Sequence, residues 1–425
     1  MISNETYNEA YVWIWLPGRT EPVVAGLLTK SGNQLVFNYG RSYLQRPDAM
    51  EIYAPELPLM QGALPLLPGL NMPSCIRDAS PDAWGRRVLI NRKLGIKGEA
   101  ATDIELGELT YLMESGSDRI GALDFQASAT EYVPRQGRHA SLEELMQSAD
   151  MVEQGIPLRP ELNQALQHGS SLGGARPKVL IEDRERKFIA KFSASNDLYN
   201  VVKAEFIAMR LAQEVGLNVA PVQLTRAMSK DVLLIERFDR TRVEGAWQRK
   251  AMVSALTIFE LDEMMAAYAS YETLAEIIRY RFTKPVETLK ELFGRIVFNI
   301  LCGNTDDHAR NHAAFWDGKA LTLTSAYDIC PQIRSGNEAS QAMLIHDGNR
   351  MSQLTTCLTA APIFLLSSAD AEAIIANQIK IIQKRFQSIC NEARLPEVDR
   401  RLMWRRQFLN PFAFYGAPDK LLIAD

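Results

Sequence analysis

The strongest constraint on the fold is an apolar helix that leads directly into a polar loop at residues 303–311. Four large apolar residues recur at the spacing of a buried helix face: Phe293, Ile296, Val297 and Ile300. Glycine commonly follows the last turn of a helix, so we expect this helix to end at Gly303. The loop then reads Gly-Asn-Thr-Asp-Asp-His-Ala-Arg-Asn. A buried helix therefore fixes one end of a strongly polar segment.

Two short strands are predicted after this loop, at residues 313–316 and 320–324. They flank Asp317-Gly318, a dipeptide typical of a tight hairpin turn. Asp328 follows the second strand by a few residues. The order of elements is therefore helix, polar loop, hairpin and a further carboxylate.

Asp306, Asn311 and Asp328 have the order that protein kinases use for phosphoryl transfer. In a kinase a catalytic-loop Asp accepts the proton of the substrate hydroxyl, and an Asn and a later Asp hold magnesium. Hard oxygen ligands of this kind suit a magnesium ion that bridges phosphate oxygens. We therefore interpret this segment as a candidate phosphoryl-transfer site.

Two other interpretations of the loop stay open at this stage. Asp and Asn side chains often only cap turns and helices, and Asp-x-x-x-x-Asn alone is a common pattern. A transition-metal cluster would use four side chains: Asp306, Asp307, His308 and His312. The two histidines stand four residues apart, which suits a helix face, but the polar loop argues against a helix here.

Composition places the chain among ordinary globular proteins. It has 425 residues, 47% of them hydrophobic and 23% charged, which is long enough for two or three domains. The formal net charge of −4 lacks the basic excess of a dedicated nucleic-acid binder. No run approaches 18 apolar residues, and the N-terminus has no signal-peptide pattern. We expect a cytoplasmic protein that does not bind membranes.

The cysteines support a reducing compartment. They are scattered, without metal-type pairs or an even disulfide framework: Cys75, Cys302, Cys330, Cys357 and Cys390. Cys302 and Cys330 flank the candidate site, where we expect them to fill apolar space rather than to react.

Residues 9 to about 130 look like a separate, strand-rich unit. Strands are expected at residues 11–16, 23–29 and 34–38, the last two joined by a hairpin. Ser80-Pro81-Asp82 is typical of a helix start, and that helix is predicted to run to Leu94. We recognise no catalytic chemistry in this unit, so its role is positioning or partner binding.

A stretch of small residues, 170–178, precedes the next pair of predicted strands. Small residues let backbone N–H groups approach phosphates closely. The pattern is neither a Walker A motif nor Gly-x-Gly-x-x-Gly, so an ordinary glycine turn is the alternative. Lys191 lies in the apolar strand that follows, where a kinase needs a lysine on the nucleotide phosphates. A lysine that reaches the surface is the alternative there.

Further kinase elements occur in the expected order. Glu205 lies on a helix with a buried stripe of Val202, Phe206 and Met209, and it either pairs with Lys191 or is solvated. A buried strand at 231–235 leads to Glu236-Arg237-Phe238, where a kinase has its adenine hinge. Every part of a kinase site therefore has a candidate in this chain: the glycine-rich loop, the strand lysine, the helix glutamate, the hinge, the catalytic Asp and the two metal ligands.

The remainder of the chain, from about residue 250, is predicted to be mainly helical. One clear amphipathic stripe belongs to the core: Ile375, Ile379, Ile382, Phe386 and Ile389. Residues 400–406 form a basic cluster that could touch nucleic acid, with a solvated helix face as the alternative.

Together these motifs resemble the HipA kinases, which are toxins of type II toxin–antitoxin systems. The matching segments are residues 171–178, 190–192, 235–240, 303–311 and 327–328, with 76–87 and 118–122 in the N-terminal unit. The resemblance covers nearly the whole chain, and its most specific element is Asn-Thr-Asp-Asp-His-x-x-Asn.

The resemblance implies an α+β, bilobed fold like that of eukaryotic protein kinases. We expect an N-terminal subdomain at residues 1–135 and a strand-rich kinase N-lobe with the glycine-rich loop, lysine and hinge at 136–245. An all-helical C-lobe with the catalytic and metal-binding loop is expected at 246–425.

The resemblance also implies serine/threonine phosphorylation that depends on ATP and Mg2+. Members of the family phosphorylate aminoacyl-tRNA synthetases, which halts translation and favours persistence. A HipB-like helix-turn-helix antitoxin holds them and binds operator DNA. Such a partner would supply most of the basic surface, which fits an acidic chain.

The family roles transfer to numbered residues of this sequence. Asp306 would be the base, and Asn311 and Asp328 the magnesium ligands. The expected ATP-binding residues are Ser171, Gly173, Gly174, Ala175, Arg176 and Lys178, then Lys191 on the phosphates, Glu236, Arg237 and Phe238 in the hinge, and His308 and Tyr327. Ser171 matches a loop serine whose autophosphorylation ejects the loop and inactivates the kinase.

The sequence departs from the family pattern at two places. Arg176-Pro177 stands where the best-known members have Gln-Glu, and Ser170 is a second candidate for autophosphorylation. Asp328 is followed by Ile-Cys rather than Phe-Gly, so a kinase-type switch is not assumed there. Two other functions stay open: a small-molecule phosphotransferase, and a non-catalytic corepressor that only binds its antitoxin and DNA.

Overall fold

The computed structural model divides the chain into two compact units. The first comprises residues 1–197, 225–253 and 315–319, and the second comprises 198–224, 254–314 and 320–425. The structure describes residues 7–94, 106–136, 140–156, 158, 166, 170–171, 174–193, 197–334 and 336–422. The division into three parts at residues 135 and 245 stays a prediction.

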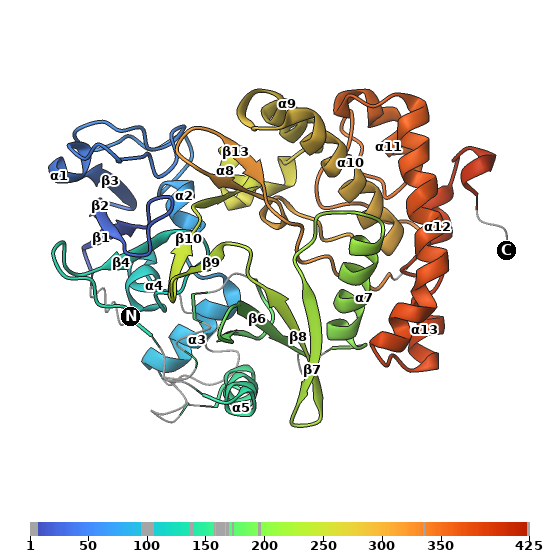
Figure 1. Cartoon of the computed structure of the whole chain (residues 1–425), viewed down its shortest axis with the longest axis horizontal. Helices are drawn as coiled ribbons and strands as arrows, with labels where there is room; N and C mark the ends of the chain where they lie inside the picture. Colours follow the sequence, from blue (N-terminus) through green and yellow to red (C-terminus); the bar gives the residue numbers. More distant parts are fainter. Residues whose placement is uncertain are drawn as a thin grey trace. The chain divides into compact units, whose positions relative to one another are not determined.

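Four antiparallel strands form the N-terminal sheet of the first unit (Figure 1). They are β1 (Glu9–Ile14), β2 (Val23–Ser31), β3 (Gln34–Tyr39) and β4 (Leu123–Gln126), in the order β3-β2-β1-β4. Short helices accompany them: α1 (Arg41–Leu44), α2 (Ser74–Arg77) and α4 (Glu108–Glu114). The strands predicted near the N-terminus are confirmed, although β1 begins two residues before the expected start at Tyr11.

The second sheet of this unit carries the predicted lysine. Its strands are β5 (Lys178–Glu182), β6 (Lys187–Phe192), β7 (Val222–Ala227) and β8 (Lys230–Glu236), in the order β5-β6-β8-β7. Helix α5 (Leu142–Glu153) begins with the expected capping box, in which Ser141 and Glu144 each accept a hydrogen bond from the other's backbone N–H. Two further strands, β9 (Arg240–Val243) and β10 (Ala246–Arg249), form a hairpin.

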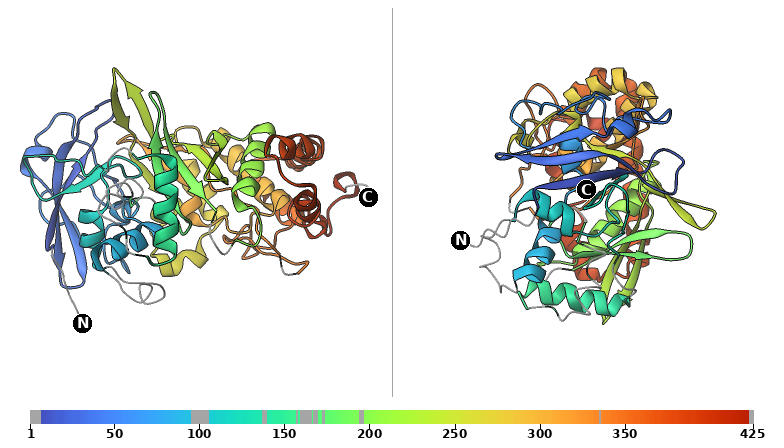
Figure 2. Two further views of the ribbon diagram at one scale, coloured as in Figure 1. Left: turned by 90° about the horizontal axis from the view of Figure 1, so that it is seen from below. Right: turned by 90° about the vertical axis from the view of Figure 1, so that its left-hand side faces the viewer.

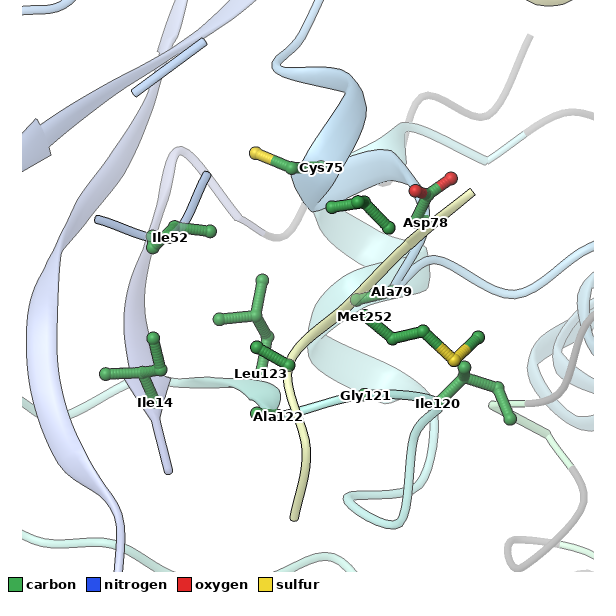
Figure 3. A pocket seen from close by; sticks show the side chains of 12 residues that line it. Ile14, Ile52, Cys75, Asp78, Ala79, Ile120, Gly121, Ala122, Leu123 and Met252 are labelled. Carbon is green, nitrogen blue, oxygen red and sulfur yellow. The ribbon is translucent and has the colours of Figure 1, made fainter. Parts of the chain in front are cut away.

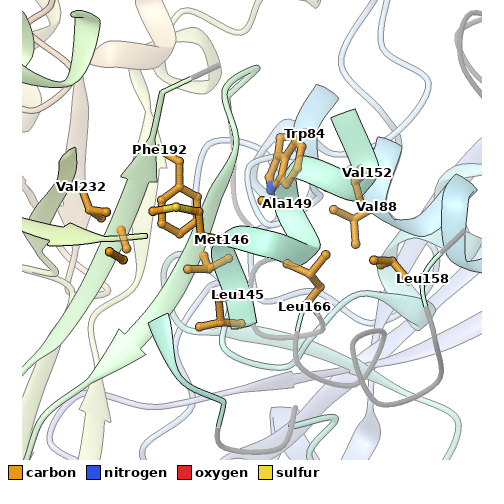
Figure 4. Close-up of a cluster of buried hydrophobic side chains, with 13 residues drawn as sticks. Trp84, Val88, Leu145, Met146, Ala149, Val152, Leu158, Leu166, Phe192 and Val232 are labelled. Carbon is orange, nitrogen blue, oxygen red and sulfur yellow. The ribbon is translucent and has the colours of Figure 1, made fainter. Parts of the chain in front are cut away.

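Buried apolar side chains join one face of this sheet to helices α5 and α3 (Ala83–Leu94), as Figure 4 shows. Trp84, Met146 and Phe192 are at most 2% exposed and come from α3, α5 and β6 in turn. Side chains of this size each gain about 1.5–3 kcal/mol from burial. The sheet therefore has one face in the core, and its strand residues of opposite parity project from the other face.

Helix α3 corrects one detail of the predicted start. It begins at Ala83 rather than directly after Ser80, and Ser80 Oγ donates a hydrogen bond to Glu108 instead of capping the helix. The Asp82 carboxylate accepts a hydrogen bond from the Gly174 N–H at 2.7 Å. Asp82 therefore makes a tertiary hydrogen bond, whereas the sequence pattern predicted an interaction of its carboxylate with the helix dipole. The helix runs to Leu94, as predicted, and Gly95, where we expect it to stop, lies outside the described residues.

The cavity drawn in Figure 3 is too small to hold a ligand. It lies among Ile14, Cys75, Leu123 and Met252 in the first unit and has a volume of about 10 Å³. Such a volume accommodates at most one water molecule. Cys75 is buried there, and the other four cysteines are buried in their own positions. The burial of Cys302 and Cys330 agrees with the apolar role expected of those two.

The second unit is mainly helical (Figures 1 and 2). Its principal helices are α7 (Val201–Glu214), α8 (Ala255–Ile258), α9 (Tyr271–Arg281), α10 (Pro285–Cys302), α11 (Leu354–Ala360), α12 (Ser368–Glu392) and α13 (Glu397–Met403). Helix α12 packs against α7, and the predicted stripe from Ile375 to Ile389 is buried. The part of the chain predicted to be all-helical also contains strands, because the predicted hairpin forms as β12 (Ala313–Trp316) and β13 (Leu321–Leu323).

Two predictions about the surface, that the chain does not bind membranes and that a basic cluster lies at residues 400–406, can be compared with the helices. None of the described helices has the length and apolar character needed to cross a membrane. In the basic cluster on α13, Arg401 pairs with Glu397 one helical turn away and is largely exposed. A contact of this cluster with nucleic acid stays a prediction.

A buried group of charges joins the hinge of the first unit to residues 118–121. Asp118 accepts hydrogen bonds from Arg237 and Arg240, each at 3.0 Å. Asp239 accepts from the same two guanidinium groups at 2.8 Å and from the Gly121 N–H at 2.8 Å. Burial acts to raise the pKa of both carboxyls, but the arginines outweigh it. The pKa of Asp118 lies well below its usual value, and that of Asp239 falls to about 2.

These pKa values predict acid sensitivity of the first unit. A carboxyl whose pKa is lower in the folded state stabilises the fold above its unfolded pKa of about 4 and loses this contribution as the pH falls below that value. We expect the denaturant midpoint to fall steeply between pH 4 and pH 2. Asp239→Asn should lower the midpoint at pH 7 by the equivalent of about 3–5 kcal/mol and should flatten its pH dependence.

The exposed Asp183 serves as a control position. It lies in an exposed turn of the same unit, where its carboxylate pairs with Arg186 and accepts hydrogen bonds from the Glu185 and Arg186 N–H groups, which an amide oxygen can also accept. Asp183→Asn should leave the midpoint at pH 7 nearly unchanged. Equal effects of the two substitutions would contradict the assignment of acid sensitivity to the buried group.

Candidate phosphoryl-transfer site

Gly303 ends α10 at the predicted position and directs the chain into the catalytic loop. It adopts a left-handed conformation with φ of +73°. A Cβ atom at this position would lie 2.7 Å from the Gln407 carbonyl oxygen. Both the backbone angle and the close approach require glycine, so the direction in which the loop leaves the helix is fixed.

Asp307 anchors the loop from inside the second unit. Its buried carboxylate accepts hydrogen bonds from the Tyr271 hydroxyl, from the Asn299 amide at 2.6 Å and from His312 Nε2 at 3.0 Å. Burial acts to raise the pKa of Asp307, but His312 and these hydrogen bonds lower it overall. With its Oδ2 atom accepting from three donors inside the protein, Asp307 holds the loop, which leaves its neighbour as the candidate for the reacting carboxylate.

Asp306, the neighbouring residue, points to the outside and has the opposite environment. Its side chain is exposed, while its carbonyl accepts hydrogen bonds from the His308 N–H at 2.9 Å and from the Asn311 amide at 3.0 Å. Partial desolvation raises the pKa of Asp306, and the nearby Asp328 and Asp307 add to this effect against the opposing influence of His308. An exposed carboxylate of raised pKa is suited to accept a proton.

Asn311 and Asp328 complete a set of oxygen donors in the same unit. The Asn311 amide nitrogen donates to the Asp306 carbonyl, which leaves the amide oxygen to face a cation. Asp328 has an unusual positive φ of +57°, a strained conformation that functional sites often retain. Tyr327 fixes the adjoining backbone because its hydroxyl donates to the Arg310 carbonyl at 2.8 Å. Carboxylate and amide oxygens together fit the preference of Mg2+.

The transition-metal interpretation is not supported. No three side chains of His, Cys, Asp or Glu gather as a metal site in the part of the chain that the structure describes. His312 is turned to Asp307 rather than grouped with His308 and Asp306. The capping interpretation is partly right, because Asp307 and Asn311 do make structural hydrogen bonds within the loop.

Two lysines stand opposite each other in the second sheet of the first unit. Lys178 on β5 and Lys191 on β6 are direct cross-strand partners, so they project from the same face of the sheet. They are 6% and 8% exposed. Two ammonium groups on one face of a sheet place positive charge together, as a site for phosphate requires.

The face that carries the two lysines is otherwise apolar. Leu180 and Ile189 project beside them, because Val179 and Ala190 of the same strands lie in the core cluster on the opposite face. Leu233 on β8 pairs with Lys191 and continues this surface toward Ile235. Leu180 and Leu233 are themselves buried, so this face is covered in the structure. Apolar side chains next to two cations are of the kind that suits a ring and its phosphates.

Helix α3 holds the described part of the glycine-rich loop. Gly174 donates its N–H to Asp82 and accepts from the Trp84 N–H at 3.1 Å, while the Trp84 indole donates to the Lys178 carbonyl at 2.9 Å. A Cβ on Gly85 would lie 2.5 Å from the Ser170 carbonyl oxygen, so the helix and the loop are in contact. The loop is therefore fixed by a helix about 90 residues earlier in the chain.

The other described residues of the glycine-rich loop make contacts within the protein. Ala175 accepts a hydrogen bond from Arg87 on α3, and Arg176 pairs with Asp197. Ser170 and Ser171 are both buried: Ser170 Oγ accepts from the Gly116 N–H, and Ser171 Oγ donates to the Asp118 carbonyl at 3.4 Å. Gly173 lies outside the described residues.

The hinge residues are placed at the end of β8. Glu236 is half-buried and lies 3.7 Å from Arg186, and Phe238 stacks edge-on against Phe315. Arg237 donates its backbone N–H to the Lys187 carbonyl and its guanidinium to Asp118 and Asp239. The N–H and the side chain of Arg237 are therefore used inside the protein, so a nucleotide contact from them is no longer expected.

The predicted site residues fall into two groups, one in each unit. Asp306, His308, Asn311, Tyr327 and Asp328 belong to the second unit, and the glycine-rich loop, the lysines and the hinge belong to the first. Pairing between Lys191 and Glu205 would join the two units and stays a prediction. The sequence did not reveal the residues that position both groups: Tyr271 and Asn299 behind the catalytic loop, and Trp84 and Arg87 behind the glycine-rich loop. The sequence indicates Asp307 and His312 only as metal ligands and Asp82 only as part of a helix start, so their positioning roles were also missed.

Family models match most of this chain. The HipA-like C-terminal domain matches residues 170–393, and the HipA N-terminal domain matches residues 14–126. The chain belongs to the HipA family. The C-terminal match alone covers more than half of the chain and includes the glycine-rich loop, the hinge and the catalytic loop. The N-terminal match includes β2, β3 and β4 of the first sheet and begins at the last residue of β1.

Individual relatives agree with this assignment over part of their length. The chain is 27% identical over 214 residues to a protein of Sinorhizobium fredii named "Putative kinase Y4mE", an alignment that covers 46% of this chain and 50% of that protein. It is 24% identical over 186 residues to the serine/threonine-protein kinase toxin HipA of Shewanella oneidensis, covering 37% of this chain and 42% of the relative. These alignments span about half of each relative or less.

A solved structure shows the same fold over almost the whole chain. It is the complex of HipA, HipB and operator DNA from Shewanella oneidensis, in which the matched chain is 18% identical. The match has a TM-score of 0.66 and covers 93% of both chains. The α+β, kinase-like fold predicted from the sequence is thereby confirmed.

The Asp307 network predicts that Tyr271 stabilises the catalytic loop. Tyr271→Phe removes a hydroxyl donor and leaves a buried carboxylate with one partner fewer, which costs about 1–3 kcal/mol. We expect a lower thermal unfolding midpoint in calorimetry. Tyr280→Phe on the same helix is the control, because Tyr280 is 87% exposed. A Tyr271→Phe midpoint equal to that of the parent would show that the network does not anchor the loop.

Proposed function

We propose that this chain is a serine/threonine protein kinase that uses ATP and Mg2+ and acts as the toxin of a HipBA-type module. The observation that carries the proposal is the contrast between adjacent carboxylates. Asp307 is buried and committed to three donors, whereas Asp306 is exposed with a raised pKa beside Asn311 and Asp328. A loop that is anchored by one buried carboxylate can hold the adjacent exposed carboxylate in place to act as a catalytic base.

Asp306 would orient the acceptor hydroxyl of a serine or threonine and take its proton. The raised pKa of its carboxyl helps, because proton transfer is most efficient when the pKa of the base approaches the working pH. The hydrogen bonds to its carbonyl from His308 and Asn311 keep the backbone in place during this step. The side chain itself remains free to follow the hydroxyl.

Asn311 and Asp328 would hold magnesium through the amide oxygen and the carboxylate. An ion held there would supply positive charge to neutralise the phosphates. The fixed backbone at Tyr327 and the constrained Asp328 keep these donors ready, so little ordering is required when the ion binds.

ATP would bind at the face of the second sheet of the first unit that carries Lys178 and Lys191. The apolar surface around Leu180, Ile189 and Leu233 suits adenine, with the backbone of Glu236 and Phe238 at its end. Lys178 and Lys191 would meet the phosphates, and Ser171, Gly174, Ala175 and Arg176 of the glycine-rich loop would cover them. This arrangement explains why two nearly buried lysines face each other.

Autophosphorylation of Ser171, or of Ser170, would release the glycine-rich loop. Both hydroxyls are buried against residues 116–118 and have no space for a phosphate in this arrangement. A modified serine would have to leave, and the loop would leave with it, since a doubly charged group cannot stay buried without cations.

The partners that we propose follow the family. A HipB-like antitoxin would bind the chain and carry it to operator DNA, by analogy with the Shewanella complex, which contains HipA, HipB and its operator DNA. The substrate would be a translation component such as an aminoacyl-tRNA synthetase, with persistence as the outcome in the cytoplasm.

Phosphopeptide mass spectrometry after incubation with ATP and Mg2+ tests the proposed function. The parent should acquire phosphate on Ser171 or Ser170, and Asp306→Ala should lose at least about 100-fold in rate, the low end of the contribution of a general base. Glu276→Ala on the surface of α9 is the control and should match the parent.

Two outcomes would overturn the proposal. A folded, fully active Asp306→Ala variant would remove the proposed base. Absence of both phosphate transfer and ATP binding in the parent would favour a non-catalytic corepressor, and transfer to small metabolites without any labelled protein in a lysate would favour a small-molecule phosphotransferase.

A further inference from the structure

We propose that residues 262–268 form a docking platform for the protein substrate, which places an apolar side chain of the substrate on Met264, Met265 and Tyr268. This inference rests on the proposed kinase function and specifies the class of substrate segment that the site takes. The observations that carry it are the exposure of these three side chains and the attachment of their segment to the catalytic loop.

The segment is a short 3-10 helix, η3 (Glu263–Tyr268), none of whose six residues is buried. Met264 is 91% exposed, Met265 is 46% exposed and Tyr268 is 67% exposed. Single exposed apolar residues are ordinary on a protein surface, but three large ones within five positions form a patch. Methionine is common on surfaces that bind varied partners, because its side chain is flexible and polarisable.

Both ends of the segment are attached to the catalytic loop. Before the exposed residues, the Glu263 carboxylate pairs with Arg310 at 2.7 Å. After them, the Tyr271 hydroxyl donates to Asp307. Arg310 and Asp307 are both loop residues within four positions of Asp306. The platform and the proposed base therefore belong to one connected group within the second unit.

The backbone of the platform is held along its length. The Asp262 carboxylate caps η3 by accepting from the Met264 N–H at 3.0 Å. The Ala267 carbonyl accepts from Arg350 at 2.8 Å, and the Ala269 carbonyl accepts from the Leu344 N–H at 3.0 Å. A fixed backbone with projecting apolar side chains loses little conformational entropy on binding, which favours recognition.

The chemistry of the platform selects one kind of occupant. The neighbouring charges are balanced, since Glu263 pairs with Arg310 and Glu260 lies 4.0 Å from Arg281. The charges near the platform therefore give little preference between acidic and basic substrate segments. The methionine side chains and the tyrosine ring favour contact with a leucine, methionine or phenylalanine of the substrate. A substrate segment with such a residue near its serine or threonine would be held while Asp306 meets the hydroxyl.

The test compares two peptides that differ only at the residues flanking one serine. One peptide has leucine at these positions and the other has serine. The variant replaces Met264, Met265 and Tyr268 together with serine, and the control replaces the exposed Val398 and Tyr415 with serine. Phosphorylation of each peptide is measured as kcat/KM, and binding of each is measured separately by fluorescence anisotropy without ATP.

The parent and the control should prefer the leucine peptide in both measurements. The triple variant should lose about tenfold in kcat/KM and in affinity for that peptide, as expected when a small group of dominant contact residues is removed. Its autophosphorylation should be unchanged, because the glycine-rich loop supplies the acceptor in that reaction. Unchanged preference in the triple variant would overturn the platform.

Other outcomes separate the platform from the proposed kinase function. If the parent transfers no phosphate at all, the kinase proposal fails, and the binding measurement still decides whether the leucine peptide uses these three residues. Light scattering distinguishes a different occupant. If the triple variant changes only from dimer to monomer and keeps its peptide preference, the surface joins two copies of the chain and the platform is overturned.

Discussion

The cost of burying a carboxylate away from water governs both units of this protein. An isolated buried charge is strongly unfavourable, so it persists only where several donors surround it. Asp118 and Asp239 are held by Arg237 and Arg240 in the first unit, and Asp307 is held by a tyrosine, an asparagine and a histidine in the second. Each group connects segments that are distant in sequence, and these connections position the glycine-rich loop, the hinge and the catalytic loop.

The adjacent residues Asp306 and Asp307 show how environment assigns different roles to identical side chains. Asp307 has a lowered pKa because its partners outweigh its burial, and Asp306 has a raised pKa because it is partly desolvated and meets two carboxylates and only one opposing group, His308. The stable charge on Asp307 fixes the loop geometry. That fixed geometry allows Asp306 to remain exposed without losing its position, and it also carries the platform formed by residues 262–268.

The glycine-rich loop depends on a different kind of support. Its described residues rest on α3, where Asp82 and Trp84 bind the backbone of Gly174 and Lys178. A stretch of small residues has few side-chain contacts of its own, so its conformation is determined by what lies against it. The N-terminal part of the chain therefore contributes to the candidate nucleotide site although it carries no recognisable catalytic motif.

Local sequence patterns were enough to predict the individual elements and the residue types of the site. The apolar spacing before Gly303, the Asp317-Gly318 turn and the capping box at Ser141 each act within a few residues, so they could be predicted from the chain. Long-range packing alone established that Asp307 is an anchor, that Arg237 is buried in an ion cluster, and that Asp82 binds Gly174 rather than serving only the helix dipole. Each assignment depends on at least one distant partner, 36 positions away for Tyr271 and Asp307, 92 for Asp82 and Gly174, and 119 for Asp118 and Arg237. Local patterns do not encode such contacts.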